Sequence, residues 1–238
     1  MSELPPTGLR IIPVGGIGEV RPGDDIADLI IGSDAKLRHH DCLVVTQKVV
    51  SKAEDRLVAV DPDDPLSHKP LVERESVRIV RRRGELIISE TTHGFVCANA
   101  GIDLSNVERG QAALLPVDSD RSARGIKDRL KARTGVDVAV IVSDTFGRPW
   151  RRGVTDVAIG CAGIAAVVDL RGTTDALGRE LMVTEVAAVD EIAAAADLVM
   201  GKATGTAVAI VRGLPDGWFR AGSVRDEIVR SPAEDLFR

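Results

Sequence analysis

The strongest constraint on the fold comes from short apolar runs, rich in Val and Ile, that are flanked by polar residues. Such runs are typical of strands covered on both faces, as in sheets with helices packed on either side. We predict strands at residues 43–46, 85–89, 136–142 and 206–211, and we expect the third strand to stop at Ser143-Asp144.

Segments with apolar residues at helical spacing alternate with these runs. Two long helices are predicted at residues 118–134 and 184–200, each followed by Gly, the usual residue just beyond a helix C-terminus. Shorter helices are predicted at residues 24–32 and 71–82. This alternation predicts the α/β class with a mixed sheet, and the length of 238 residues allows two lobes, whose boundaries the pattern does not define.

Composition excludes several classes of protein. Aromatic residues make up only 3% of the chain and the net charge is -5, so the stacking and basic surfaces of a nucleic-acid binder are missing. The three cysteines are widely spaced, without a CxxC pair, and are expected to be reduced buried thiols. Residues 1–7 do not resemble a signal peptide, and no apolar run approaches the roughly 20 residues of a membrane span. We therefore expect a cytoplasmic protein without a membrane partner.

The segment 136–152 carries the most informative pattern. Asp144 and Thr145 follow an apolar run, and ligands of α/β sheets bind at the carboxyl ends of strands. A carboxylate and a hydroxyl are hard oxygen ligands that suit Mg²⁺ or Mn²⁺. Arg148, Arg151 and Arg152 come next, and guanidinium groups bind phosphates and carboxylates. The pattern alone also allows, and slightly favours, a turn-capping Asp followed by arginines on a solvated loop.

Other segments allow two readings each. Asp103, in the Gly- and Asn-rich stretch 93–106, is either a second metal ligand or the start of an Asx-turn. The Gly-rich stretch 13–19 is neither a GxGxxG nor a Walker A motif, so it either cradles phosphate or forms a turn. Lys48 and Lys52 either neutralise phosphate or are surface lysines. The acidic residues of the helix predicted at 184–200, Asp197 included, are expected on a solvated face.

Two longer motifs add a family resemblance. The stretches HGFVCANAGIDLSN (93–106) and SDTFGRPWRRGVTDVAIG (143–160) together resemble the coenzyme F-420-0:L-glutamate ligases, and further matching stretches follow the family order along nearly the whole chain. The resemblance implies an acid–amino-acid ligase of coenzyme F-420 biosynthesis. Such an enzyme uses GTP and adds one or more L-glutamates to F-420-0, γ-linked after the first, through an acyl-phosphate intermediate.

The resemblance also assigns roles to residues. It implies two divalent ions, Mn²⁺ or Mg²⁺, held with the help of Asp103, Asp144 and Thr145. We expect catalysis to depend on Asp103 and Asp144, and on Arg151 from the arginine pattern described above. Contacts with GTP are implied for Ile17, Gly18, Glu19, Val20, Gln47, Lys52, Asn106, Met200 and Gly201. Gln47 stands where many relatives have Ser, so this contact has the weakest support.

The resemblance finally implies an architecture. It predicts a two-lobed α/β fold and an intertwined homodimer. Residues 1–238 are expected to form one ligase unit, without the nitroreductase-like domain that is fused to it in mycobacteria. Two other functions remain open: a carboxylate–amine ligase with another acceptor, and a non-catalytic nucleotide- or coenzyme-binding module.

Overall fold

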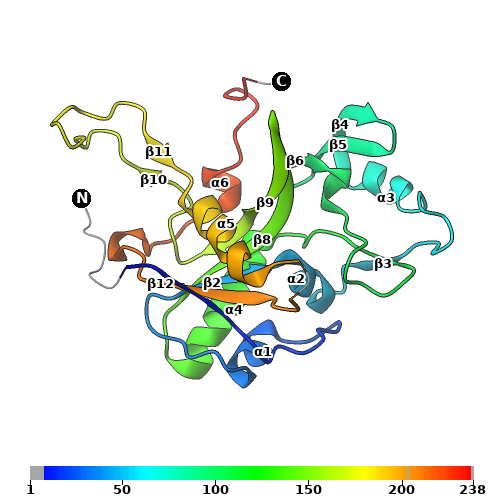
Figure 1. Ribbon diagram of the computed structural model, residues 1–238, viewed down its shortest axis with the longest axis horizontal. Coiled ribbons are helices and arrows are strands. Elements are labelled where there is room, and N and C mark those ends of the chain that lie inside the picture. The colour runs from blue at the N-terminus through cyan, green and yellow to red at the C-terminus, as the bar shows by residue number, and fades with distance from the viewer. Residues whose placement is uncertain (1–7, 203, 237–238) are drawn as a thin grey trace.

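A mixed five-stranded sheet runs through the centre of the protein, as seen in a computed structural model that describes residues 8–202 and 204–236 (Figure 1). β2 and β8 are parallel neighbours, and the other strands pair antiparallel. The strand order is β1 (Arg10–Pro13), β12 (Val208–Arg212), β2 (Cys42–Thr46), β8 (Ala139–Arg148) and β9 (Arg151–Ala162).

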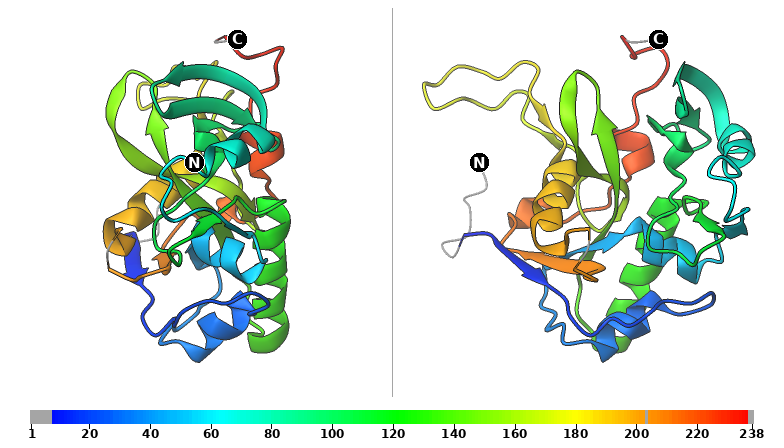
Figure 2. Two further views of the ribbon diagram at one scale, coloured as in Figure 1. Left: turned by 90° about the vertical axis from the view of Figure 1, so that its right-hand side faces the viewer. Right: turned by 45° about the vertical axis from the view of Figure 1, so that its right-hand side comes forward.

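Helices cover both faces of this sheet, which explains its continuous apolar runs. Leu43 and Val45 of β2 face one apolar core, shared with α1 (Ile26–Gly32), α2 (Gln47–Ala53) and α4 (Ser119–Thr134). Cys42 and Val44 face the opposite core, shared with α5 (Ala188–Met200) and α6 (Val224–Glu227). Figure 2 shows α4 and α5 on opposite sides of the sheet.

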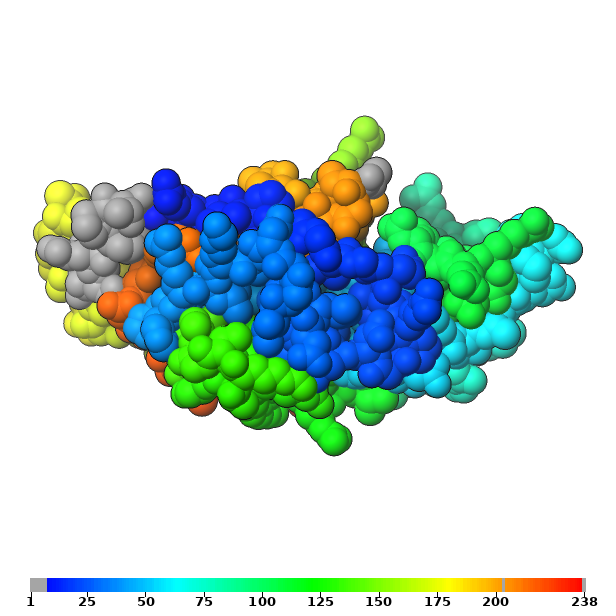
Figure 3. Space-filling view, turned by 90° about the horizontal axis from the view of Figure 1, so that it is seen from below, coloured from blue at the N-terminus to red at the C-terminus, as the bar shows by residue number. Residues whose placement is uncertain are grey.

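Residues 57–114 form a second, smaller apolar core beside the main sheet (Figure 1). Seen from below, the blue segment that includes α1 covers the middle of the molecule (Figure 3). The part of the chain that contains the smaller core, in cyan and green, extends to one side. The smaller core is built from α3 (Lys69–Arg74), a 3₁₀ turn (Asn99–Gly101), the pair β3 (Leu57–Ala59) and β7 (Gln111–Ala113), and the antiparallel strands β4 (Ser76–Arg83), β5 (Leu86–Thr91) and β6 (Val96–Ala98).

Several predicted elements are confirmed. Strands occupy the runs predicted at 43–46, 85–89 and 206–211 within one to two residues at most ends. The helix predicted at 118–134 is α4, which Asp118 caps through the backbone amide of Arg121 and which Gly135 ends with a positive φ of 72°. The helix predicted at 24–32 is α1, capped by Asp25. The observed class is a mixed α/β fold with several sheets.

The prediction of a helix at residues 71–82 is wrong. The helix ends at Arg74, and residues 76–83 form strand β4. Gly84, with a φ of 56°, then turns the chain back into β5. Pairing with the apolar β5 and the β-branched residues of this segment favour a strand, and they outweigh the helical spacing of a few apolar residues.

Two predicted boundaries are also wrong. The strand predicted at 136–142 begins at Ala139 and does not stop at Ser143-Asp144, because it continues to Arg148 and returns as β9. This β8–β9 hairpin projects from the body of the protein (Figure 2). The helix predicted at 184–200 begins only at Ala188, because β11 (Glu185–Val186) pairs with β10 (Val168–Asp169).

No helix within residues 8–202 and 204–236 combines the length and apolar character that a membrane crossing requires. The inference about a signal peptide concerns residues 1–7, which lie outside the described residues.

Asp120, on α4, accepts hydrogen bonds from β9 and from the C-terminal segment. Its carboxylate Oδ1 accepts hydrogen bonds from the backbone amides of Cys161 (2.7 Å) and Val224 (2.9 Å). Its Oδ2 accepts from the Ser223 hydroxyl (2.9 Å) and the Arg225 amide (3.1 Å). The side chain is buried, so these four bonds replace water as its partners.

We predict that Asp120→Asn lowers the free energy of unfolding by about 3 kcal/mol, because an amide would place its own N–H groups against two of the four donors. Urea unfolding of the ligand-free protein measures this value. The matched control is Asp128→Asn, the same substitution at an exposed position of the same helix, which should change stability by less than about 0.5 kcal/mol. Equal effects of the two variants would contradict this role of Asp120.

Candidate active site

A cavity of about 370 Å³ opens beside the carboxyl end of β2 and the middle of β8. Because these strands run parallel with Thr46 opposite Ser143, the residues that follow Thr46 lie next to Asp144 and Thr145. The structure brings nearly all the predicted site residues to this cavity. Its lining includes Ile17, Gly18, Glu19, Val20, Gln47, Lys52, Asn106, Asp103, Asp144, Thr145, Met200 and Gly201.

Arg151 is the exception. It is exposed at the start of β9, near the tip of the β8–β9 hairpin, and it does not line the cavity. Its neighbours in the pattern, Arg148 and Arg152, are exposed on the same hairpin. The structure therefore separates the arginines from the carboxylates, although they lie within eight residues of Asp144 in the sequence.

Asp144 lies among acidic neighbours. The pKa of its carboxyl is raised to about 7, first by burial and also by the carboxylates of Asp103 and Asp156. The backbone amide of Thr145, which donates to Asp144 Oδ1 at 2.8 Å, and the ammonium of Lys202 act in the opposite direction. The site therefore holds a carboxyl whose negative charge is poorly compensated in the ligand-free protein.

The negative charge of Asp103 is compensated by a lysine. Lys48 Nζ forms an ion pair with Asp103 Oδ2 at 2.8 Å and a hydrogen bond with Ser105 Oγ at 2.8 Å. Burial alone would raise the pKa of Asp103, but the hydrogen bonds from Lys48 and the Ser105 amide lower it below its ordinary value. The hydrogen bond from the Ser105 amide forms the predicted Asx-turn. Asp103 therefore both starts this turn and lines the cavity.

Asp156 and Lys202 are site residues that the sequence analysis missed. Asp156 lies opposite Thr145 on β9 and accepts hydrogen bonds from the hydroxyls of Ser143 and Thr145. Lys202 Nζ donates to the same Thr145 hydroxyl. A hairpin prediction alone would not have found Asp156, because the tight turn that sets Arg148 opposite Arg151 would pair Thr145 with Val154. An irregularity between Gly147 and Arg148 shifts the register and brings Asp156 opposite Thr145.

Asp197 also differs from expectation. We predicted a solvated face for it, yet it lines the cavity and its pKa is raised by burial and by Asp156. Gln47 lines the cavity with its side chain turned inward, where its amide donates to Ser51 Oγ at 2.6 Å and to the Leu114 carbonyl at 3.0 Å. The amide oxygen Oε1 of Gln47 is buried and has no hydrogen-bond partner among the described residues.

The opposite wall consists of the Gly-rich loop that precedes α1 and the basic face of α2. Lys52 Nζ forms an ion pair with Glu19 of this loop. Together with Lys48 and Lys202, it brings three ammonium groups to the cavity, each in contact with an oxygen of the protein itself. Ammonium groups in this arrangement can change partners when a phosphate arrives.

The donor set fits a divalent cation that is shared with a ligand. Asp103, Asp144 and Thr145 supply hard oxygen atoms, and the charge on Asp144 is poorly compensated. Within the described residues, however, no three His, Cys, Asp or Glu side chains come close enough to hold a metal ion by themselves. An ion here would need further oxygens from phosphates and water, which is how Mg²⁺ usually binds in phosphoryl-transfer sites.

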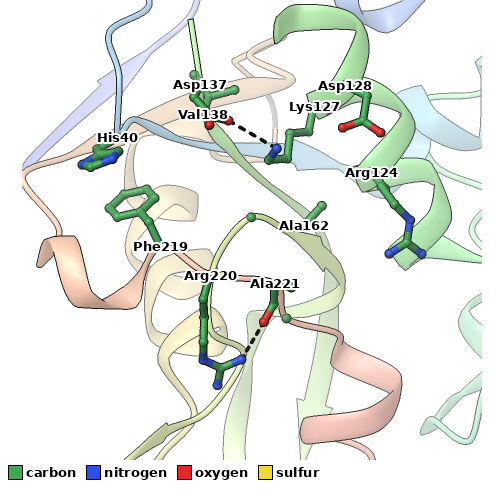
Figure 4. A pocket seen from close by; sticks show the side chains of 12 residues that line it. His40, Arg124, Lys127, Asp128, Asp137, Val138, Ala162, Phe219, Arg220 and Ala221 are labelled. Carbon is green, nitrogen blue, oxygen red and sulfur yellow. Dashed lines mark hydrogen bonds and ion pairs between the residues drawn. The ribbon is translucent and has the colours of Figure 1, made fainter.

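A second cavity, of about 380 Å³, lies at the other end of the sheet, beside the start of β8 and the end of β9 (Figure 4). None of the predicted site residues lines it. Two of its cations are paired within the protein: Lys127 pairs with Asp137 at 3.3 Å, and Arg220 pairs with Glu227 at 2.9 Å.

The fold and the site define an α/β protein with a mixed acidic and basic cavity suited to phosphates and divalent cations. Comparisons with known proteins are more specific. The family described as F420-0:Gamma-glutamyl ligase matches residues 16–213. A protein of Methanopyrus kandleri named Coenzyme F420:L-glutamate ligase is 46% identical over 255 aligned positions, covering 100% of both chains.

Two other relatives carry the same name. The protein of Methanothermobacter thermautotrophicus is 42% identical, over 97% of this chain and 99% of its own length. The protein of Archaeoglobus fulgidus is 40% identical, over 97% of this chain and 96% of its own length. The chain therefore belongs to the F420-0:Gamma-glutamyl ligase family.

The raised pKa of Asp144 predicts a pH-dependent stability difference. Because its folded pKa of about 7 exceeds the ordinary value of 3.8, the folded protein binds the proton more tightly than the unfolded chain. The stabilisation that Asp144 gives below pH 4 should therefore be lost as the pH rises to about 7. We predict that Asp144→Asn is more stable than the wild type at pH 8 by on the order of 2 kcal/mol.

Urea unfolding in the presence of a chelator, from pH 4 to pH 8, measures this difference. It should shrink towards pH 4, where Asp144 is protonated in the folded protein and close to half protonated in the unfolded chain. A difference that is constant across this range would show that the charge on Asp144 is well compensated.

Proposed function

We propose that the protein joins L-glutamate to coenzyme F-420-0 in the cytoplasm, forming GDP and phosphate from GTP. The convergence of Asp103, Asp144 and Thr145 with three lysines in one cavity is the structural observation that carries this proposal. The full-length relatives named as coenzyme F420:L-glutamate ligases support the acceptor and the amino acid.

The chemistry explains the need for such a site. A carboxylate is a poor electrophile, so the γ-phosphoryl group of GTP is first transferred to the carboxylate of F-420-0, which gives an acyl phosphate and GDP. The amine of L-glutamate then attacks the acyl carbon, loses a proton and expels phosphate, which leaves an amide. Both steps concentrate negative charge, so they depend on cations around the reacting groups. Further rounds add γ-linked glutamates.

Different residues of the cavity bind the nucleotide and the divalent cations. The loop 17–20, Lys52, Asn106 and residues 200–201 bind the nucleotide, with Gln47 as an additional contact. Asp103, Asp144 and Thr145 hold the divalent cations. Two bound Mn²⁺ or Mg²⁺ ions would neutralise the phosphate oxygens and the developing charge. Lys48 and Lys202 exchange their present protein partners for phosphate oxygens as the nucleotide enters.

Arg151 acts outside the cavity in this proposal. Together with Arg148 and Arg152 it gives the hairpin a concentrated positive charge without carboxylates in the same strand segment. Such a group of guanidinium side chains suits the acidic parts of the substrates that extend beyond the cavity, including the phosphate and carboxylates of the coenzyme tail.

Product analysis tests the proposed reaction. The protein is incubated with F-420-0, L-glutamate, GTP and Mn²⁺, and the coenzyme product is weighed by mass spectrometry. We expect F-420-0 to gain the mass of one or more glutamate residues, with GDP formed in equal amount, and ATP to support less turnover than GTP. Tight GTP binding without any product would favour a non-catalytic module, and turnover only with another acceptor would favour a different ligase.

We also propose that the protein is a homodimer. Residues 170–184 form an arm between β10 and β11 that extends from the body (Figure 1). Leu177, Met182 and Val183 on this arm are 85%, 69% and 85% exposed, an apolar surface that a second copy would cover.

Light scattering at micromolar concentration should therefore give twice the mass of one chain. The triple substitution Leu177→Ser, Met182→Ser and Val183→Ser should shift it towards one chain, because it removes the exposed apolar side chains. A wild-type protein with the mass of a single chain would contradict the dimer.

A further inference from the structure

Asp156 has an unusual position for a residue without an assigned role. It lies on β9 directly opposite Thr145, and only 5% of its surface is exposed. Each of its two carboxylate oxygens accepts a hydroxyl hydrogen bond. Ser143 Oγ donates to Oδ2 at 2.9 Å, and Thr145 Oγ1 donates to Oδ1. Both oxygens thus accept a bond from the neighbouring strand, and the residue also lines the cavity.

This arrangement fixes the direction of the Thr145 hydroxyl. A hydroxyl has one proton, and Thr145 donates it to Asp156, so its lone pairs remain as acceptors for the cavity. A second contact supports this orientation of the hydroxyl. The ammonium of Lys202 donates to Thr145 Oγ1, which therefore acts as an acceptor. A cation of the protein therefore already uses the lone pair that a metal ion would need.

We propose that Asp156 is a positioning residue that holds the Thr145 hydroxyl as a hydrogen-bond acceptor towards the divalent cation. This inference rests on the proposed function, in which Thr145 is a cation ligand. Partners of this kind orient the ligands of metal sites, and their replacement usually weakens metal affinity about 10- to 100-fold. In this proposal Asp156 acts through Thr145, to which it is hydrogen-bonded.

A double-mutant cycle separates this role from direct metal binding. The variants are Asp156→Asn, Thr145→Val and the double variant, and the readout is Mn²⁺ affinity in the presence of GDP, measured from the EPR signal of free Mn²⁺. Asn has the size of Asp, but its single acceptor oxygen cannot replace the two carboxylate oxygens that accept from Ser143 and Thr145. We expect about a tenfold loss or more in each single variant, and no further loss when Asp156→Asn is added to Thr145→Val.

Ser143→Ala is the matched control, because it removes the other hydroxyl bond of Asp156 and leaves the bond to Thr145. It should retain Mn²⁺ affinity within about twofold of the wild type. If Asp156→Asn does not fold, Asp156→Glu replaces it. Glu keeps the charge but moves the carboxylate by one methylene, so positioning predicts weaker Mn²⁺ binding here too.

Three results would overturn the inference. One is wild-type Mn²⁺ affinity in folded Asp156→Asn or Asp156→Glu. A second is an equal loss from Asp156→Asn with and without the Thr145 hydroxyl, because Asp156 would then act on the ion itself. The third is a wild-type protein that binds no Mn²⁺ with GDP, and this result alone would also contradict the metal dependence of the proposed function.

Discussion

The parallel pairing of β2 with β8 is the constraint on which the site depends. It places Thr46 opposite Ser143, so the first turn of α2 lies beside Asp144 and Thr145. An antiparallel arrangement would place these two segments at opposite ends of the sheet. The long β8–β9 hairpin then adds Asp156 from the next strand. Three separate parts of the chain thus meet around one cavity because of the strand order.

The carboxylates that line the cavity are electrostatically unfavourable in the ligand-free protein. Asp103, Asp144, Asp156 and Asp197 line it from different elements, and burial together with the charges of Asp103 and Asp156 raises the pKa of Asp144. Natural proteins commonly lose stability at functional sites in this way. A phosphate–metal ligand would relieve the repulsion, since it brings cations to the carboxylates and anions to the lysines.

The core of the fold could be predicted from the sequence, because its strands and helices are long and strongly patterned. The errors lie where one pattern fits two structures. Residues 71–82 have some helical spacing, but pairing with β5 decides their structure. Asp144 seemed to end a strand because polar residues follow it, whereas hairpin pairing carries the strand on to Arg148.

The site could be predicted largely from resemblance and only partly from residue patterns. The patterns identified Asp103, Asp144 and the lysines as candidates, but they could not bring segments forty residues apart together. Asp156 and Lys202 were missed because each depends on a partner from another element. Arg151 was grouped with Asp144 by proximity in sequence, while the hairpin moves it away from the cavity.

Anomalous X-ray diffraction from crystals grown with Mn²⁺ and GDP would test the central claim most directly, because manganese can be located independently of the protein. We expect anomalous peaks at coordination distance from the carboxylates of Asp103 and Asp144 and from the Thr145 hydroxyl, with Lys48 and Lys202 turned towards phosphate oxygens. Manganese and nucleotide bound elsewhere, with Lys48 still paired with Asp103, would contradict this account of the site.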